Sequence, residues 1–263
     1  MKTKITLFFS LLLVASFVFS QTSIPPGDVS GTWDIAGSPY LIEGDIKIPD
    51  NDQLDIVPGV EIEFQGYYKF EVFGIISAIG TEADTIFIRA KLPIPGHRGL
   101  RILTDPANTD TNLLRYCHFT HGNPNGSSPD NCGGAIGIDY LCNVTIDHCV
   151  FENNKAVLGL NSAGGAISAR GYNGEISNCT FIGNESMQGG AIMFYNESNG
   201  KIMDCYFEGN TASDGGGAIS VWVKSNPQIS GNEFVNNQAT IYGGAIDIFD
   251  SCFALINDNY FQG

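Results

Sequence analysis

Apolar and polar residues alternate in short runs along the second half of the chain. The clearest run has the form Ile-x-x-Cys-x-Phe and occurs at residues 146–151, 176–181 and 202–207. A cysteine and a phenylalanine two positions apart point to the same side of a strand. The isoleucine, three positions before the cysteine, has the opposite parity, so a corner must separate the two. This pattern predicts short strands joined by tight corners.

A second motif repeats in phase with the first. Gly-Gly-Ala-Ile begins at residues 133, 164, 189, 216 and 243, with spacings of 31, 25, 27 and 27 residues. A Phe-x-x-Asn motif precedes each of the last four copies. Two motifs that recur together with a period of about 20 to 50 residues indicate one structural unit that is repeated and stacked.

The intervals between the motifs contain too few helix-forming runs to place a helix in each unit. Each unit is therefore one coil of about three short strands, which rises roughly 4.8 Å to the next coil. Parallel strands are joined by right-handed crossovers as a rule. We therefore predict an all-β fold, a right-handed parallel β-helix.

Two columns of side chains are expected along this β-helix. The asparagine of Phe-x-x-Asn follows a residue that tolerates positive φ, and stacked asparagine amides can bond from coil to coil. The cysteine column lies two residues before the phenylalanine, and asparagine replaces cysteine there in the last two units. A buried thiol suits such a column, so we expect free thiols, with Cys132 left undecided. The expected ladder residues are Asn154, Asn184, Asn210, Asn237, Cys117, Cys149, Cys179 and Cys205.

The strand that begins with Gly-Gly-Ala-Ile has two faces of different polarity. Burial of an unpaired charged side chain costs several kcal/mol, so the isoleucine face is expected to point inward. The opposite face then carries one column on successive coils: Asp139, Arg170, Tyr195, Trp222 and Phe249. Its three aromatic residues are expected to form an exposed stripe, suited to the face of a sugar ring or to a partner protein. The alternative is that the aromatic ladder only stiffens the outer sheet, or that a loop covers it.

The first half of the chain lacks the repeated motifs of the second half. Residues 1–20 have a short basic start and an apolar run, which predict a cleaved secretory signal peptide. Residues 21–37 are interpreted as a lead-in segment, and residues 38–104 as an N-terminal cap with irregular β-helix coils. Residues 105–263 are the β-helix repeats, and because they end within a corner motif we expect a fragment or a truncated product. An insertion at residues 120–131 lengthens the first repeat and is expected to form a protruding loop.

Net charge narrows the class of partner. The chain has 28 acidic and 13 basic residues, a net charge of −15, which becomes −17 once Lys2 and Lys4 leave with the signal. Such acidity argues against nucleic acid and anionic membrane surfaces as partners. No run after the signal is apolar enough to span a bilayer. Calcium binding is compatible with the acidity, but no pattern requires it, so no cofactor is expected.

The carboxylates do not favour catalysis. Asp139 and Arg170 are expected to form a surface ion pair. Asp247 and Asp250 have no acidic neighbours in the adjacent unit, whereas glycoside hydrolysis needs two carboxylates that flank one bond. An enzyme is therefore the less favoured interpretation.

The histidines do not favour a metal site. His118 and His148 are sequence neighbours of column cysteines, and they point outward if those cysteines point inward. A joint site of histidine and cysteine is therefore geometrically awkward. His97 lies in a loop, where the sequence indicates no partner for it.

The paired Gly-Gly-Ala-Ile and Phe-x-x-Asn motifs over residues 114–263 resemble the repeat of chlamydial polymorphic outer membrane proteins, within the wider pectin-lyase-like class of right-handed β-helices. The resemblance implies an exported surface adhesin. We therefore expect a secreted or cell-surface, non-catalytic protein with a role in adhesion or surface structure, whose partner is a protein or glycan of a host or neighbouring cell. The alternative is an extracellular protein that binds or degrades polysaccharides, as other members of the wider class do.

Overall fold

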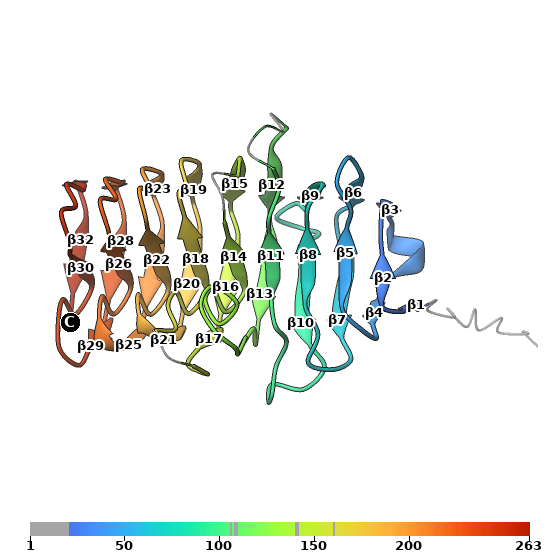
Figure 1. Cartoon of the computed structure of the whole chain (residues 1–263), viewed down its shortest axis with the longest axis horizontal. Helices are drawn as coiled ribbons and strands as arrows, with labels where there is room; N and C mark the ends of the chain where they lie inside the picture. The colour runs from blue at the N-terminus through green and yellow to red at the C-terminus, as the bar shows by residue number, and fades with distance from the viewer. Residues whose placement is uncertain (1–20, 106, 108–109, 140–141, 160) are drawn as a thin grey trace, which may run out of the picture.

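The chain winds into a parallel β-helix whose coils follow one another along a single axis (Figure 1). The computed structural model describes residues 21–105, 107, 110–139, 142–159 and 161–263. The expected signal peptide, residues 1–20, lies outside the described residues. Every strand pairs in parallel with the corresponding strand of the next coil, and within the described residues the one helical turn is a short 3-10 turn, η1 (Ile35–Gly37). The predicted all-β parallel β-helix is confirmed.

The strands form three long sheets and one short sheet, named A to D here. Sheet A contains β1 (Thr22–Ile24), β4 (Tyr40–Ile42), β7 (Glu61–Phe64), β10 (Ile86–Ala90), β13 (Cys117–Thr120), β16 (Val150–Glu152), β20 (Thr180–Ile182), β24 (Tyr206–Glu208), β28 (Glu233–Val235) and β32 (Tyr260–Gln262). Sheet B contains β2 (Gly27–Asp28), β5 (Ile46–Ile48), β8 (Phe70–Val72), β11 (Leu100–Ile102), β14 (Ile136–Ile138), β18 (Ile167–Arg170), β22 (Ile192–Tyr195), β26 (Ile219–Trp222) and β30 (Ile246–Ile248). Sheet C contains β3 (Gly31–Trp33), β6 (Gln53–Ile56), β9 (Ile75–Ile79), β12 (Asn112–Arg115), β15 (Val144–Asp147), β19 (Glu175–Ser177), β23 (Lys201–Met203), β27 (Gln228–Ser230) and β31 (Leu255–Asn257). Sheet D contains β17 (Lys155–Ala156), β21 (Glu185–Gln188), β25 (Thr211–Gly215) and β29 (Gln238–Ala239).

The N-terminal part of the chain is more regular than its sequence indicates. Residues 21–37, interpreted above as a lead-in, contain β1, β2 and β3, which pair in register with β4, β5 and β6. The strands between residues 38 and 104 likewise join the same three sheets as the later coils. The lead-in and the irregular coils are therefore corrected to ordinary coils of the solenoid. Their core is filled by isoleucine, valine and leucine at alternating positions, without the recurrent motifs that mark the later coils.

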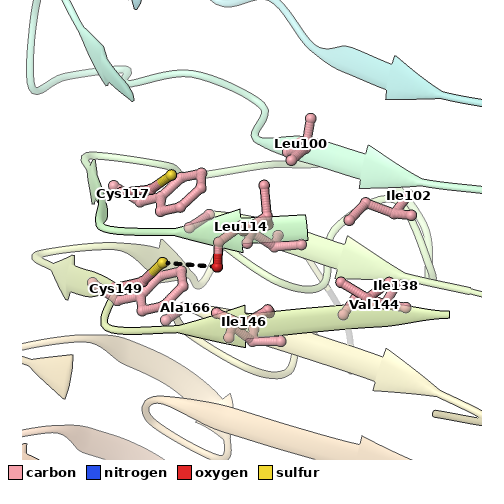
Figure 2. Close-up of a cluster of buried hydrophobic side chains, with 14 of the residues drawn as sticks. Leu100, Ile102, Leu114, Cys117, Ile138, Val144, Ile146, Cys149 and Ala166 are labelled. Atoms are coloured by element: carbon pink, nitrogen blue, oxygen red, sulfur yellow. Dashed lines mark hydrogen bonds between the residues drawn. The ribbon is translucent and has the colours of Figure 1, made fainter. Parts of the chain in front are cut away.

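Identical side chains stack on one another in the core of the later coils. The ring centroids of successive repeat phenylalanines, from Phe119 to Phe261, lie 4.7 to 5.0 Å apart with nearly parallel planes. This spacing is the separation of neighbouring strands, about 4.8 Å. Figure 2 shows two adjacent coils of this core, in which Leu114 stacks on Ile146 and Cys117 on Cys149. One coil therefore supplies the floor on which the next coil packs.

The cysteine column is a hydrogen-bonded ladder of free thiols. Cys117, Cys149, Cys179 and Cys205 are buried and unbridged, and Cys132 is also a free thiol. The Cys149 thiol donates to the Leu114 carbonyl at 3.4 Å, the contact drawn in Figure 2. The Cys179 sulfur accepts from the Cys149 N–H at 3.4 Å.

Further along the axis, the Asn232 amide takes the same position. It accepts from the Cys205 N–H and donates to the Ile202 carbonyl. Thiol and amide interchange there because each both accepts from and donates to the neighbouring coil.

The corners of the coils use backbone conformations with positive φ. The residue before each column cysteine or asparagine, such as His148 or Asp204, has φ between 48° and 70°. The residue two positions after each repeat phenylalanine also has positive φ, for example 54° at Asn153 and 60° at Gly183. Both corners are as predicted from the parity break and from the asparagines and glycines at these sites.

His97 lies inside the molecule, which corrects its assignment as a loop residue without a partner. Its ring stacks on Phe64 with centroids 4.6 Å apart, and Nδ1 accepts a hydrogen bond from the Gly99 N–H at 3.0 Å. The other ring nitrogen, Nε2, lies 3.1 Å from the Thr120 carbonyl oxygen, to which it donates in the neutral tautomer. Burial lowers the pKa of His97 to about 3, although the Thr120 carbonyl partly opposes this shift.

The buried His97 predicts an acid-sensitive contribution to stability. The unfolded chain binds a proton on this histidine below pH ~6.5, whereas the native state does not until pH is close to 3. The free energy of unfolding should therefore fall by about 2 kcal/mol between pH 7 and pH 5 through this residue. Urea unfolding at both pH values checks this, with His97→Gln as the comparison because glutamine does not titrate. Equal pH dependence in the two proteins would contradict the assignment.

Candidate functional site

One column of side chains crosses sheet B at the C-terminal ends of its strands. It consists of Asp139, Arg170, Tyr195, Trp222 and Phe249. Arg170 pairs with Tyr195 in the strand register, and Tyr195 pairs with Trp222. Asp139 directly follows β14, and Phe249 directly follows β30. The structure therefore aligns these residues on successive coils. It does so because Gly-Gly-Ala-Ile sets the same strand start in each unit.

The column is not the exposed stripe that was expected. Asp139 is only 7% exposed, Arg170, Tyr195 and Trp222 are half-buried, and Phe249 is 60% exposed. A second small hydrophobic cluster accounts for this difference. It consists of Cys132, Ala163 and Met193, with Tyr195 and Trp222 packed against it, and it lies apart from the main core.

Segments before the glycine pairs rise beside the column and create a cleft of about 420 Å³. Its floor includes the outward residues Gly137, Ser168 and Met193 of sheet B. One wall is the column itself, and the opposite wall is built from residues of the connecting segments and from Gln188, the last residue of β21 in sheet D. These wall residues are Ser128, Pro129, Cys132, Asn161, Ala163 and Gln188. The insertion at residues 120–131 thus contributes to the cleft through Ser128 and Pro129.

Arg101, which the sequence analysis did not single out, fixes the wall at one end of the cleft. It is the strand neighbour of Gly137, and its guanidinium donates to the carbonyls of Cys132, Gly133 and Arg98 at 2.7 to 2.9 Å. Burial lowers the pKa of Arg101 to about 10, so the side chain remains charged at neutral pH. Three carbonyl acceptors satisfy it, which holds the end of the insertion against sheet B.

Asp139 and Arg170 form a sheltered ion pair at the same end. Arg170 Nε lies 3.6 Å from Asp139 Oδ1, and the Asp139 side chain is only 11% exposed. Burial raises the pKa of Asp139, while the positive charges of Arg170 and Arg101 act against the rise. The Arg170 guanidinium also lies over the Tyr195 ring, 5.8 Å from its centroid. The expected surface ion pair is therefore a partly buried contact between a carboxylate, a guanidinium and a ring.

The opposite end of the cleft is aromatic and acidic. The Trp222 and Phe249 rings lie 5.2 Å apart and are tilted by 46°. The Trp222 indole N–H donates to Asp247 Oδ2 at 3.4 Å, and Asp250 lines the cleft beside Phe249. The edge of the Trp222 indole is thus held by a hydrogen bond, and carboxylates neighbour both rings.

A third ladder, not identified from the sequence, holds the corner behind the column. Ser198, Ser225 and Cys252 each lie three residues after a column residue and donate to its carbonyl, at 2.7 to 2.9 Å. The Ser198 hydroxyl accepts from the Tyr172 N–H, and the Ser225 hydroxyl accepts from the Ser198 N–H. The constant spacing of three was the available signal. Serine is common in turns, so this spacing alone does not indicate a ladder.

The two carboxylates that line the cleft, Asp139 and Asp250, are too far apart to act on one glycosidic bond. They follow β14 and β30, strands of sheet B that are four coils apart. Four steps of about 4.8 Å separate them by about 19 Å, whereas glycosidase pairs lie roughly 5 to 10 Å apart. This separation does not match that of a glycosidase pair.

The other candidate side chains, the histidines considered for a metal site, lie apart from one another. His118 lies 3.2 Å from Glu152, and His148 lies 2.8 Å from Asp147, which also pairs with Arg115. In the described part of the chain, no three histidine, cysteine or acidic side chains converge into a group that could hold a metal ion. Over the same residues, no helix is long and apolar enough to cross a membrane.

Comparison with known proteins supports the β-helix fold. The family model described as "Right handed beta helix region" matches residues 108–263, more than half of the chain. The chain is also similar to Protein bark beetle of Drosophila melanogaster, with 28% identity over 88 residues, 30% of this chain and 3% of that protein. The chain therefore spans only a small part of that relative. No solved structure matches. The predicted right-handed winding is thus supported, and the chain belongs to the right-handed β-helix family.

Proposed function

We propose that this protein is secreted or displayed at a cell surface and acts there as a non-catalytic adhesion protein, which holds a protein or glycan of another cell in the cleft of sheet B. The observation that carries the proposal is the aligned aromatic wall of Tyr195, Trp222 and Phe249 beside a hollow of about 420 Å³. Aromatic side chains that line a hollow beside a few polar groups are typical of recognition surfaces.

Three further features support this role. The expected signal peptide directs the chain out of the cell. The repeat motifs resemble those of polymorphic outer membrane proteins, which are surface adhesins. The net charge of −15 suits a soluble extracellular surface. The separation of Asp139 and Asp250 argues against the alternative of polysaccharide cleavage. Release of reducing or unsaturated sugars from pectin, alginate or glycosaminoglycans by the protein would overturn the non-catalytic role.

Removal of the Trp222 side chain tests the proposed binding. Trp222→Ala is expected to reduce retention of the purified protein on cells at least about tenfold, as for a central aromatic anchor. Phe253→Ala is the matched control, because Phe253 is 81% exposed and lies outside the cleft. Flow cytometry of labelled protein measures retention, and circular dichroism verifies the fold. Unchanged retention of a folded Trp222→Ala variant would refute the cleft as the binding site.

A further inference from the structure

The cleft has an uneven distribution of charge along the axis. Among its described lining residues, Arg170 is the one basic side chain, and it is already paired with Asp139. Trp222 and Phe249, one and two coils beyond Tyr195, lie beside Asp247 and Asp250. This half of the cleft thus combines aromatic rings with neighbouring carboxylates, and no basic side chain is among its described lining residues.

Lys224 is the nearest basic residue in the sequence to Trp222, but it does not supply a cation to this half of the cleft. Its side chain is exposed, and it forms no ion pair within 4.0 Å among the described residues. Lys224 is also absent from the lining of the cleft. Lys224 lies next to Asp250 on the adjacent coil, where its backbone N–H donates to the Asp250 carbonyl at 3.0 Å, but among the described residues its ammonium forms no ion pair with the Asp250 carboxylate.

The contacts of Arg170 show which chemical group suits the Trp222–Phe249 half of the cleft. Arg170 places its guanidinium between a carboxylate, 3.6 Å away, and an aromatic ring, 5.8 Å from its carbon. Aromatic rings and a carboxylate also lie together in the other half, where Trp222 and Phe249 continue the column of Tyr195 and Asp250 directly follows Phe249. A planar cation stacks well on tryptophan and pairs well with a carboxylate.

We propose that the Trp222–Phe249 half of the cleft binds an arginine or lysine side chain of a basic peptide segment in a partner protein. This inference rests on the proposed adhesive function and names the chemistry of its partner. The overall charge of −15 attracts such a segment from a distance. Arginine is the better ligand, because its guanidinium can stack on the indole while it donates to Asp250.

A pair of peptides tests the charge requirement. The intact protein is titrated with N-acetyl-Gly-Gly-Arg-Gly-Gly-amide and with the same peptide carrying neutral citrulline, while NMR follows the two indole N–H signals. The arginine peptide is expected to shift the Trp222 signal and to leave that of buried Trp33 unchanged. It is expected to bind at least about tenfold more tightly than the citrulline peptide, as for loss of a charge-assisted contact. Equal binding of the two peptides would overturn the inference.

Variants then locate the site. Trp222→Ala removes the reporting indole, so its binding is measured by isothermal titration calorimetry, in which saturable binding of the arginine peptide is expected to be lost. Asp250→Asn is expected to weaken binding about threefold to tenfold. Asp258→Asn is the control, because Asp258 is an exposed carboxylate outside the cleft. Equal weakening by Asp250→Asn and Asp258→Asn would show general charge attraction and overturn the inference.

A glycan ligand gives a separate outcome. Cellohexaose that binds in a Trp222-dependent manner, with no binding of either peptide, would overturn the cationic ligand and leave the adhesive function intact. Cell retention that does not depend on Trp222 would instead remove the proposed function itself. The two failures are therefore distinguishable.

Discussion

Gly190→Ala should lower the free energy of unfolding by at least about 3 kcal/mol, whereas Gly244→Ala should change it by less than about 1 kcal/mol. Both residues are the second glycine of a Gly-Gly-Ala-Ile motif, and neither has a positive φ. The two substitutions add the same methyl group at the same position of two coils. Their expected effects differ because their surroundings differ.

The second glycine lies where two coils approach most closely. A Cβ atom at Gly190 would collide with the carbonyl oxygen of Gly217 in the next coil and with the backbone of Thr211. Gly165 and Gly217 meet the same obstruction, each from the glycine carbonyl of the following coil. At Gly244, in contrast, the nearest atom is the Asn237 carbonyl oxygen at 3.6 Å, an ordinary contact. Relief of the collision at Gly190 requires displacement of a backbone that is hydrogen-bonded on both sides.

Urea denaturation followed by circular dichroism measures the difference between the two variants. Stacked repeats do not always unfold in one step, so the midpoints of the first and last transitions are compared with those of the parent protein. Similar stability losses in the two variants would show that the glycine is selected for backbone freedom and not for the close approach of coils.

The architecture of the later coils was readable from the sequence because it depends on periodicity. Identical residues at one phase must stack in a solenoid, so the phenylalanine, cysteine and asparagine columns follow from their spacing alone. The inward face of Gly-Gly-Ala-Ile followed from polarity, and Ile136 and Phe194 on that face are fully buried. Each inference uses a local rule that the fold repeats in every coil.

The N-terminal coils were harder to recognise because varied residues fill their core. Ile48, Val72 and Ile102 occupy equivalent positions in successive strands of sheet B, and all three are fully buried. Any of several aliphatic side chains fits such a position. No fixed motif therefore marks the coil, and strand pairing alone reveals it.

The cleft could be predicted only in part. The column that forms one wall lies on the regular strands, so its alignment was visible in the sequence. The opposite wall comes from the connecting segments around Pro129, Cys132 and Ala163, which have no repeat. Its position depends on long-range contacts, such as those of Arg101 with the Cys132 and Gly133 carbonyls. No local rule specifies such contacts, which is why an open stripe was expected instead of a cleft.

Asn184→Leu should lower the free energy of unfolding by about 4 kcal/mol or more, because several buried groups lose their partners together. Asn184 is fully buried. Its amide donates to the Phe151 carbonyl and to Asn210 Oδ1, both at 2.9 Å. Its oxygen accepts from the backbone and side-chain N–H groups of Asn154, at 3.0 and 3.1 Å. Leucine has a similar volume but can make none of these bonds, and water cannot replace them at a buried corner.

A second asparagine ladder on the surface provides the matched control. Asn199 is exposed, and its oxygen accepts from the backbone and side-chain N–H groups of Asn226, at 3.1 and 3.3 Å. Its geometry thus repeats that of Asn184, but water can satisfy the same groups when the amide is removed. Asn199→Leu is therefore expected to cost less than about 1 kcal/mol. Equal losses in the two variants, measured by urea denaturation, would mean that ladder geometry and not burial determines the stability of the coils.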